Sequence, residues 1–84
     1  MEDDSADLIL YSTSACHLCE LAEQLLMPWV NAGLRIRVDD ISEDDALFER
    51  YGLTIPVLRH CATGAELNWP FDAAAVTALL AGEV

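Results

Sequence analysis

The sequence predicts an α/β domain, a four-stranded mixed sheet flanked by three helices in the order strand, helix, strand, helix, strand, strand, helix. Three kinds of segment indicate this order: an apolar run without alternation, stretches that alternate between apolar and polar residues, and stretches with apolar residues at helical spacing. Residues 1–84 fit one domain with a thin core. We expect folded structure from Leu8 onward and leave Met1 to Asp7 open.

The first strand and the first helix have clear patterns. Residues 8–11 are all apolar, which is typical of a central strand covered on both faces. From Leu18 the apolar residues return at helical spacing with polar residues between them, which predicts a helix with one buried stripe. Because proline has no amide hydrogen, we expect this helix to end or bend near Pro28.

An alternating stretch at 34–39 predicts the first edge strand. Leu34, Ile36 and Val38 fall on one face, and two arginines and Asp39 fall on the other. Since a helix separates this strand from the first one, the two can run parallel through a right-handed crossover.

A short second helix is expected after this strand. Ser42 and Asp45 have the spacing of a capping box. Ile41 and Ala46 occupy the positions of a hydrophobic staple. Gly52 can supply a left-handed stop. The residues predicted to face the core repeat at helical spacing: Leu47, Phe48 and Tyr51.

A β-hairpin is predicted next. Its first strand, 57–60, starts directly after Pro56, where a missing amide hydrogen costs the sheet least. The segment 62–64 turns the chain back, and residues 65–69 alternate as a second edge strand does. The sheet therefore has two inner strands and two edge strands.

The last helix is marked at both ends. Asp72 is expected to cap its start, with Phe71 and Val76 as a staple, and Gly82 lies near its end. Because Trp69 and Phe71 occupy alternating and staple positions, we expect them to pack in the core rather than to form a partner-binding patch.

The charge balance limits the partners of this chain. Fifteen acids face four basic residues, all arginine, and the formal net charge is −11. Nucleic acid and anionic membrane surfaces are therefore poor partners. The acidic surface is expected to maintain solubility, and a basic protein partner stays open.

The first residues have no basic segment and no long apolar run before Cys16, so no secretory signal is predicted, and no stretch approaches membrane-spanning length. The cytoplasm is the expected compartment. In that compartment a close cysteine pair is more often catalytic or metal-binding than a structural staple. The three cysteines also cannot all pair within one chain.

Cys16-His17-Leu18-Cys19 lies where the first strand leads into the first helix. The unpaired amide hydrogens and the dipole of a helix N-terminus stabilise a thiolate, which favours Cys16 as the attacking thiol. Cys19 lies one helical turn further on, within reach of a mixed disulfide formed at Cys16. We therefore predict thiol–disulfide exchange in which Cys16 attacks and Cys19 resolves.

Cys16-His17-Leu18-Cys19 and Thr54-Ile55-Pro56 resemble the redox motif and the cis-proline loop of glutaredoxins and thioredoxins. Other stretches resemble a family of small bacterial glutaredoxin-like proteins: Arg50-Tyr51-Gly52, Ile55-Pro56-Val57-Leu58 and Trp69-Pro70-Phe71-Asp72. The resemblance covers nearly the whole chain. It implies a thioredoxin-like fold, the catalytic pair Cys16 and Cys19, and a cis Ile55–Pro56 bond packed against that pair.

The same resemblance implies where a substrate binds. The backbone of the loop before the third strand is expected to contact the substrate, with Thr54 and Ile55 as specificity residues. The full set of expected substrate-binding positions lies in this loop and beside the first cysteine: His17, Leu18, Thr54, Ile55 and Pro56. Protein disulfides and small-thiol disulfides are the expected substrates, and no cofactor and no metal are expected beyond the cysteines themselves.

Some features of glutaredoxins are absent. They usually carry a basic residue after the second cysteine and a lysine before the first, whereas this chain has Glu20 and no lysine. The glycine pair that helps to hold glutathione is replaced by residues 67–70. We therefore expect weak or absent glutathione-dependent activity, and we expect Glu20 to oppose thiolate formation at the nearby cysteines.

Two other functions stay open. Cys16 and Cys19 could bind zinc or an iron–sulfur cluster together with His17, His60 or Cys61, although zinc sites normally draw on two separated pairs. The chain could also be a non-catalytic acidic binding module. His17 can either tune the nucleophile or serve as an exposed spacer. Cys61 is expected to be structural, as a small apolar side chain.

Overall fold

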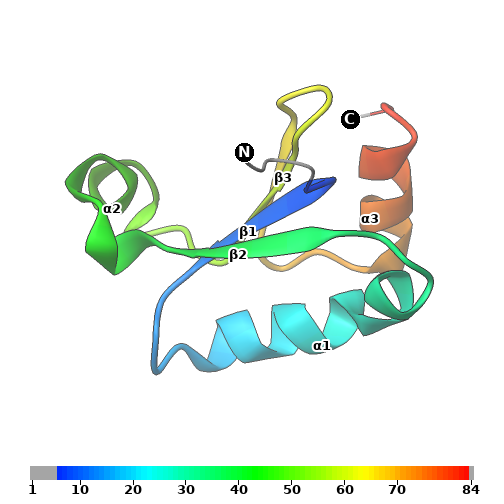
Figure 1. Ribbon diagram of the computed structural model, residues 1–84. Helices are drawn as coiled ribbons and strands as arrows, with labels where there is room; N and C mark the ends of the chain where they lie inside the picture. The colour runs from blue at the N-terminus through cyan, green and yellow to red at the C-terminus, as the bar shows by residue number, and fades with distance from the viewer. Residues whose placement is uncertain (1–5, 84) are drawn as a thin grey trace.

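The computed structural model describes residues 6–83, and Figure 1 shows the arrangement of its elements. The strands and helices follow the predicted order, with one short 3₁₀ turn, η1, added before the second helix. Their bounds are β1 (Leu8–Ser12), α1 (His17–Asn31), β2 (Ile36–Asp40), η1 (Ile41–Glu43), α2 (Asp45–Tyr51), β3 (Val57–His60), β4 (Glu66–Asn68) and α3 (Ala73–Leu80).

The four strands form one mixed sheet in the order β2-β1-β3-β4. β1 runs parallel to β2 and antiparallel to β3, and β3 pairs antiparallel with β4. Leu10 lies opposite Val38 on one side and opposite Leu58 on the other. This arrangement confirms the predicted mixed sheet with two inner and two edge strands.

The main core lies between one face of the sheet and the helices α1 and α3. Figure 1 shows α1 running along this face, with the lower end of α3 close to the far end of α1. The buried residues of this core come from both inner strands and both helices: Leu8, Leu10, Ala22, Leu26, Leu58, Phe71, Val76 and Leu79. Their burial confirms the apolar stripe predicted for α1 and the staple predicted for α3.

A second, smaller cluster lies on the other face of the sheet, where α2 and η1 approach it. It consists of Tyr11, Ile41, Tyr51 and Val57, with Ile9, Leu47 and Ile55 packed against it. Because side chains alternate along a strand, β1 sends Leu8 and Leu10 to the main core and Ile9 and Tyr11 to this cluster. β1 is thus the central strand that its unbroken apolar run predicts.

The first helix does not end at Pro28, as its sequence had suggested, but continues to Asn31. Pro28 is exposed, and so is Gln24, whose carbonyl would otherwise accept the missing amide hydrogen. Water can therefore hydrate that carbonyl. Trp29 packs against the main core in the last turn and favours the continuation.

The start and the buried side of α2 differ from the prediction. Asp44, not Ser42, caps the helix, and its carboxylate accepts the amide hydrogens of Ala46 at 2.9 Å and Leu47 at 3.2 Å. Gly52 follows the helix with φ −55°, so it is not in the left-handed region. Phe48 is 58% exposed, because Leu47 and Tyr51, four residues apart on one face of α2, form the side that packs in the small cluster.

The hairpin and the last helix agree with the sequence. Asp72 caps α3 by accepting the amide hydrogen of Ala75 at 2.9 Å. Gly82 ends α3 with φ +77°, a left-handed conformation that glycine adopts without strain. Trp69 and Phe71 pack edge to face with ring centroids 5.1 Å apart, which confirms their place in the core. The Trp69–Pro70 bond is cis, and no local pattern had indicated it.

The region left open at the start of the chain is partly described. Asp7 is held to the segment before β2, since its amide donates to the Arg35 carbonyl at 2.7 Å and its carboxylate accepts the Arg35 amide at 3.0 Å. Ordered backbone therefore begins before Leu8. Residues 1–5 lie outside the part of the chain that the structure describes.

Candidate dithiol active site

The two cysteines of the motif meet at the start of α1. Cys16 is the N-cap residue with extended backbone angles, and Cys19 lies in the first turn. Their Cα atoms are 5.2 Å apart and their sulfurs are joined as a disulfide. The Cys16 sulfur also accepts the amide hydrogen of Cys19 at 3.2 Å. The sulfur therefore takes the place of the oxygen that an N-cap side chain normally supplies.

The cysteines differ in accessibility. Cys19 is only 2% exposed, whereas Cys16 is half-buried. Cys16 follows Ala15, which has φ +57°, a left-handed conformation that is uncommon for a residue with a side chain. This turn leads the chain from β1 into the helix. A reagent approaching from solvent thus reaches Cys16 before Cys19.

The two residues between the cysteines face solvent. Leu18 is 46% exposed, and His17 is the exposed first residue of α1. The His17 ring lies 4.0 Å from the Glu20 carboxylate, with both side chains largely exposed. Water screens such a pair strongly, so it contributes little to stability.

The loop before β3 leaves the same end of the sheet as the cysteine loop. β1 ends at Ser12 and antiparallel β3 begins at Val57, which lies opposite Tyr11. Three residues separate Ser12 from Cys16, and Pro56 directly precedes β3. The Ile55–Pro56 bond is cis, as the resemblance implied.

The backbone donors of this loop are already used within the protein. The amide hydrogens of Thr54 and Ile55 both go to the Tyr51 carbonyl, at 2.9 and 3.1 Å. The carbonyl of the buried Pro56 accepts the amide hydrogen of Trp69 at 3.2 Å. Within residues 6–83, the carbonyls of Thr54 and Ile55 accept no hydrogen bond. The loop therefore offers a substrate acceptors rather than donors.

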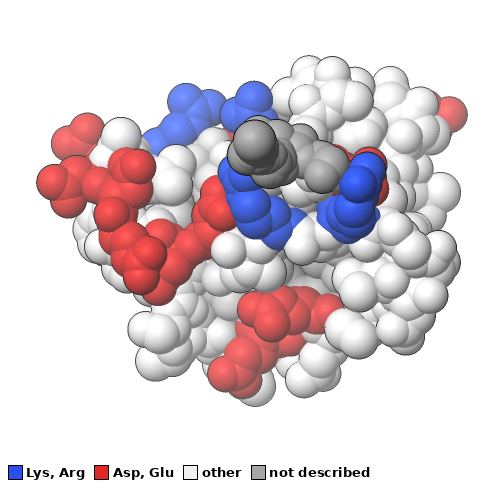
Figure 2. Space-filling model, in the orientation of Figure 1, with Lys and Arg blue, Asp and Glu red and all other residues white. Residues whose placement is uncertain are grey.

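Acidic residues gather in two areas of the surface (Figure 2). Figure 2 shows them gathered over the region of α2 and again over α1. Hydrogen bonds from the hydroxyl and amide of Ser42 lower the pKa of Asp40, and Thr13 in the cysteine loop contributes in the same direction. The acidic cluster runs from the end of β2 through η1 into α2 and consists of Asp40, Glu43, Asp44, Asp45 and Glu49. Its first member, Asp40, lies opposite Ser12, the last residue of β1 before the cysteine loop.

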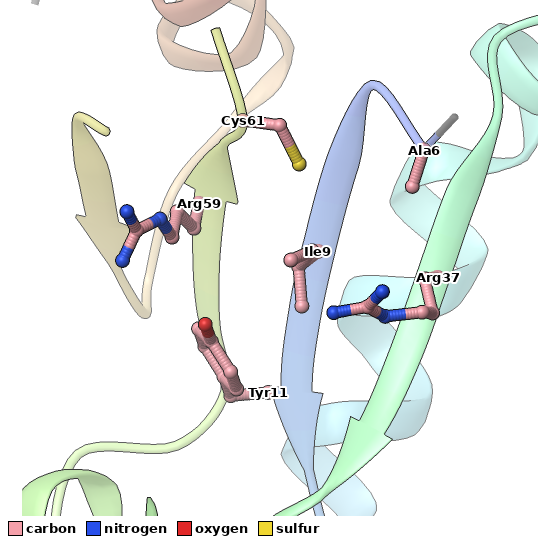
Figure 3. A pocket seen from close by; sticks show the side chains of 6 residues that line it. All are labelled: Ala6, Ile9, Tyr11, Arg37, Arg59 and Cys61. Atoms are coloured by element: carbon pink, nitrogen blue, oxygen red, sulfur yellow. The ribbon is translucent and has the colours of Figure 1, made fainter. Parts of the chain in front are cut away.

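The third cysteine lies elsewhere. Cys61 directly follows β3 and is exposed, so the expectation of a structural, buried side chain is wrong. A strand end at the surface leaves its side chain in solvent. Figure 3 shows its sulfur near Ile9 in a hollow on the outer face of the sheet. The Arg37 guanidinium lies on the opposite side of Ile9 (Figure 3). Arg37 forms an ion pair with Asp39 at 2.9 Å, which raises the pKa of Arg37.

The described residues give the metal-binding alternative no support. Between residues 6 and 83 no group of three or more histidine, cysteine, aspartate or glutamate side chains is placed to hold a metal ion. His60 instead pairs with the Thr63 hydroxyl at 3.2 Å in the hairpin turn.

Over the same range, no helix is both long and apolar enough to cross a membrane.

Tyr51 is a residue that the sequence patterns did not select for the site. It was assigned only to the buried side of α2, yet its carbonyl binds the loop that precedes β3. Its hydroxyl donates to Glu66 on β4 at 2.5 Å. The burial of this side chain raises the pKa of Tyr51, and the hydrogen bond to Glu66 adds to that rise. The spacing along one helix carries no signal for contacts with β4.

These features together define the class of protein. A βαβαββα fold, a dithiol at the start of the first helix and a cis-proline directly before the third strand are those of a thioredoxin-fold protein. Residues 7–81 match the family described as Glutaredoxin-like domain (DUF836). The chain therefore belongs to this glutaredoxin-like family.

Solved structures of bacterial proteins support the assignment. The X-ray structure of target protein XcR50 from X. campestris is 40% identical, with a TM-score of 0.76, over 89% of this chain and 96% of that one. The solution structure of protein Ne2328 from Nitrosomonas europaea has a TM-score of 0.73 over 93% of this chain and 96% of that one. At 24% identity the second likeness shows the fold alone. No curated protein matches this chain.

Proposed function

We propose that this protein is a dithiol–disulfide oxidoreductase in which Cys16 attacks a substrate disulfide and Cys19 resolves the mixed disulfide. The observation that carries the proposal is the geometry of the pair, with an accessible Cys16 sulfur at the helix N-cap and a buried Cys19 one turn inside. A helix N-terminus favours a thiolate on the sulfur that caps it. The asymmetry between the two cysteines thus comes from position.

The reaction balances without a cofactor. The Cys16 thiolate attacks one sulfur of the substrate disulfide, forms a mixed disulfide and releases the other substrate sulfur as a thiolate. The Cys19 thiolate then attacks the Cys16 sulfur, forms the Cys16–Cys19 disulfide and releases the second substrate thiolate. The substrate gains two electrons and the protein loses two. A dithiol reductant returns the protein to its starting state.

The charges around the site favour one class of substrate. Glu20 and the acidic cluster near the cysteine loop repel anions such as glutathione disulfide and attract positively charged polypeptides. The carbonyls of Thr54 and Ile55, which accept no hydrogen bond from residues 6–83, suit a polypeptide backbone, which supplies amide hydrogens. We therefore propose a cationic protein disulfide as the substrate, contacted by His17, Leu18 and the Thr54–Pro56 loop. We further propose that this protein acts in the cytoplasm.

Trapping the mixed disulfide tests the roles of the two cysteines. In a Cys61→Ser background, Cys19→Ser should form a stable adduct with a peptide disulfide, because no second thiol can displace the peptide. Cys16→Ser should form none at the same peptide concentration. Intact-mass spectrometry before and after dithiothreitol measures the adduct and its release.

The unmodified chain provides the matching control. Mild oxidation should remove two hydrogens from it through an intramolecular bond, and dithiothreitol should restore them. Trapped adducts in Cys16→Ser but not in Cys19→Ser would reverse the assigned roles. A chain that oxidises only to a dimer linked through Cys61 would refute the proposal.

A further inference from the structure

We propose that Tyr51 is a positioning residue that fixes the Thr54–Ile55 segment beside the dithiol. It acts on substrate binding through this loop and does not itself touch the reacting sulfurs. The inference rests on the proposed function and extends it to the end of α2. Three groups of contacts carry it.

The first group meets at one backbone oxygen. The Tyr51 carbonyl accepts the amide hydrogens of Thr54 at 2.9 Å and Ile55 at 3.1 Å, and the Thr54 hydroxyl approaches the same oxygen at 3.3 Å. A carbonyl oxygen has two lone pairs, so three donors use its full capacity. The position of this oxygen therefore determines where Thr54 and Ile55 lie.

The second group holds the side chain of Tyr51. Its ring stacks on Tyr11, with centroids 4.3 Å apart and planes inclined by 16°. The Arg50 guanidinium lies 5.3 Å from the ring centroid, within cation–π distance. Tyr51 and Tyr11 are both buried, so the ring stack is shielded from water, whereas Arg50 is exposed.

The third group anchors the hydroxyl, which donates to the Glu66 carboxylate at 2.5 Å. Hydrogen bonds to a charged acceptor are stronger than those between neutral groups. Glu66 lies on β4, and its carboxylate is also 4.0 Å from Arg59 on β3. Tyr11 lies on β1, so the last residue of α2 contacts β1 and β4 directly and is linked to β3 only through Glu66.

These contacts form a short path from the sheet to the loop. When the hydroxyl loses its anchor, the end of α2 can move, and the carbonyl that holds Thr54 and Ile55 moves with it. The Cys16 sulfur is held separately, by the amide of Cys19. Loss of the anchor should therefore weaken substrate binding while leaving the thiol chemistry intact.

The test compares Tyr51→Phe with Tyr11→Phe. Each removes one hydroxyl from the same stacked pair, but in the described residues the Tyr11 hydroxyl forms no hydrogen bond. In the full chain we expect Tyr51→Phe to raise KM for a cationic peptide disulfide about fivefold to tenfold, with kcat within about twofold. Tyr11→Phe should leave both constants unchanged.

Two further measurements separate positioning from general loss of stability. Amide hydrogen exchange followed by NMR should be about tenfold faster for Thr54 and Ile55 in Tyr51→Phe than in Tyr11→Phe. Alkylation of reduced Cys16 by iodoacetamide should proceed at the same rate in both variants. Thermal unfolding confirms that each variant is folded at the assay temperature.

Variants of Glu66 test the anchor from its other end. Glu66→Ala should raise KM as Tyr51→Phe does, whereas Glu66→Gln, which keeps an acceptor oxygen, should restore most of the binding. The double variant Tyr51→Phe/Glu66→Ala should be no worse than either single variant, because both remove one interaction.

The outcomes are distinguishable. An unchanged KM in Tyr51→Phe, or an equal rise in Tyr11→Phe, would overturn the role of Tyr51. Unchanged exchange of the Thr54 and Ile55 amides in Tyr51→Phe would also overturn it, whatever the activity. An unmodified chain without disulfide-exchange activity would overturn the proposed function, and the role in substrate binding would fall with it.

Discussion

Two cysteine sites of this chain differ in structure: one is a pair at the start of a helix, and the other is a single cysteine after a strand. Cys16 caps the 15-residue helix α1, with Cys19 one turn further on and joined to it. Cys61 follows β3 on the outer face of the sheet, and the hollow that it lines contains no other cysteine among the described residues. Cys61 is exposed, whereas Cys16 is half-buried.

The comparison shows that exposure alone does not make a thiol suited to disulfide exchange. Turnover needs a second thiol held beside the first, because that thiol must release the substrate. The first turn of a helix provides this spacing and a backbone amide that donates a hydrogen bond to the Cys16 sulfur. A strand end provides neither, even with an arginine in the same hollow (Figure 3).

The largest expected effect separates the two sites by turnover. Cys16→Ser should lower the rate of peptide-disulfide reduction at least about 100-fold, because the nucleophile is lost. Cys61→Ser should stay within about twofold of the unmodified chain. The rates are measured with a dithiol reductant in excess. A large loss in Cys61→Ser would break the comparison, since the lone thiol would then take part in the reaction.

A smaller effect concerns the intrinsic reactivity of the thiols. In the fully reduced chain at pH 7, iodoacetamide should modify Cys16 about tenfold faster than Cys61, since the helix terminus stabilises the thiolate. Peptide mapping by mass spectrometry follows each site. Glu20→Gln should speed the reaction at Cys16 about twofold and leave Cys61 unaffected. Equal rates at Cys16 and Cys61 would show that the helix end confers no advantage.

Substrate charge should sharpen the difference between the two regions further. A lysine-rich peptide disulfide should have a kcat/KM about tenfold above that of glutathione disulfide at low salt. The ratio should fall in 1 M salt, where the screening length is about 3 Å. Glutathione-coupled activity at the level of the peptide would contradict the proposed substrate class.

A pair of single-charge variants controls for net charge in that experiment. Glu43→Gln removes one charge of the acidic cluster, in η1, and Glu83→Gln changes the end of the chain, which Figure 1 places away from the start of α1. Only Glu43→Gln should reduce the preference for the cationic peptide, by about twofold. Equal effects of both variants would assign the preference to net charge.

The smallest effect is a pH dependence confined to the outer face. Burial and the bond to Glu66 raise the pKa of Tyr51 above its ordinary value of 10.0. The stability from neutral Tyr51 is therefore complete below the tyrosine pKa of the unfolded chain and is lost as pH rises through the folded pKa. Urea unfolding between pH 8 and about pH 11 should show this loss.

Two variants check the source of the alkaline loss. Tyr51→Phe should be about 1 kcal/mol less stable at pH 7 and should lose less stability at high pH, because the titrating group is gone. The double variant Cys16→Ser/Cys19→Ser should lose as much stability as the unmodified chain when pH rises from 7 to the alkaline range, because it retains Tyr51. An equal alkaline loss in Tyr51→Phe would place the titrating group elsewhere.

Much of the fold and part of the site were predictable from local patterns. Leu8 to Tyr11 indicated the central strand, the apolar spacing from Leu18 indicated the buried stripe of α1, and Asp72 indicated the cap of α3. The cysteine spacing placed one sulfur at a helix start and the other one turn inside. Each of these features depends on residues close in sequence, so a short window contains the information.

The errors came from contacts that no short window contains. Pro28 stays inside α1 because its side of the helix faces solvent while Trp29 packs against the main core. Phe48 is exposed because Leu47 and Tyr51 form the side of α2 that packs in the small cluster. Cys61 is exposed because β3 ends at His60, one residue before it, at the surface.

The sequence by itself determined the order of the elements and the different positions of Cys16 and Cys19. The spacing of apolar residues and the start of a helix both depend on residues that are close along the chain. Tertiary structure alone decided what holds the loop before β3. Tyr51, Tyr11 and Glu66 lie far apart along the chain, and only the pairing of β1, β3 and β4 brings them together. A hydrogen bond and a ring stack need contact in space, which sequence spacing does not report.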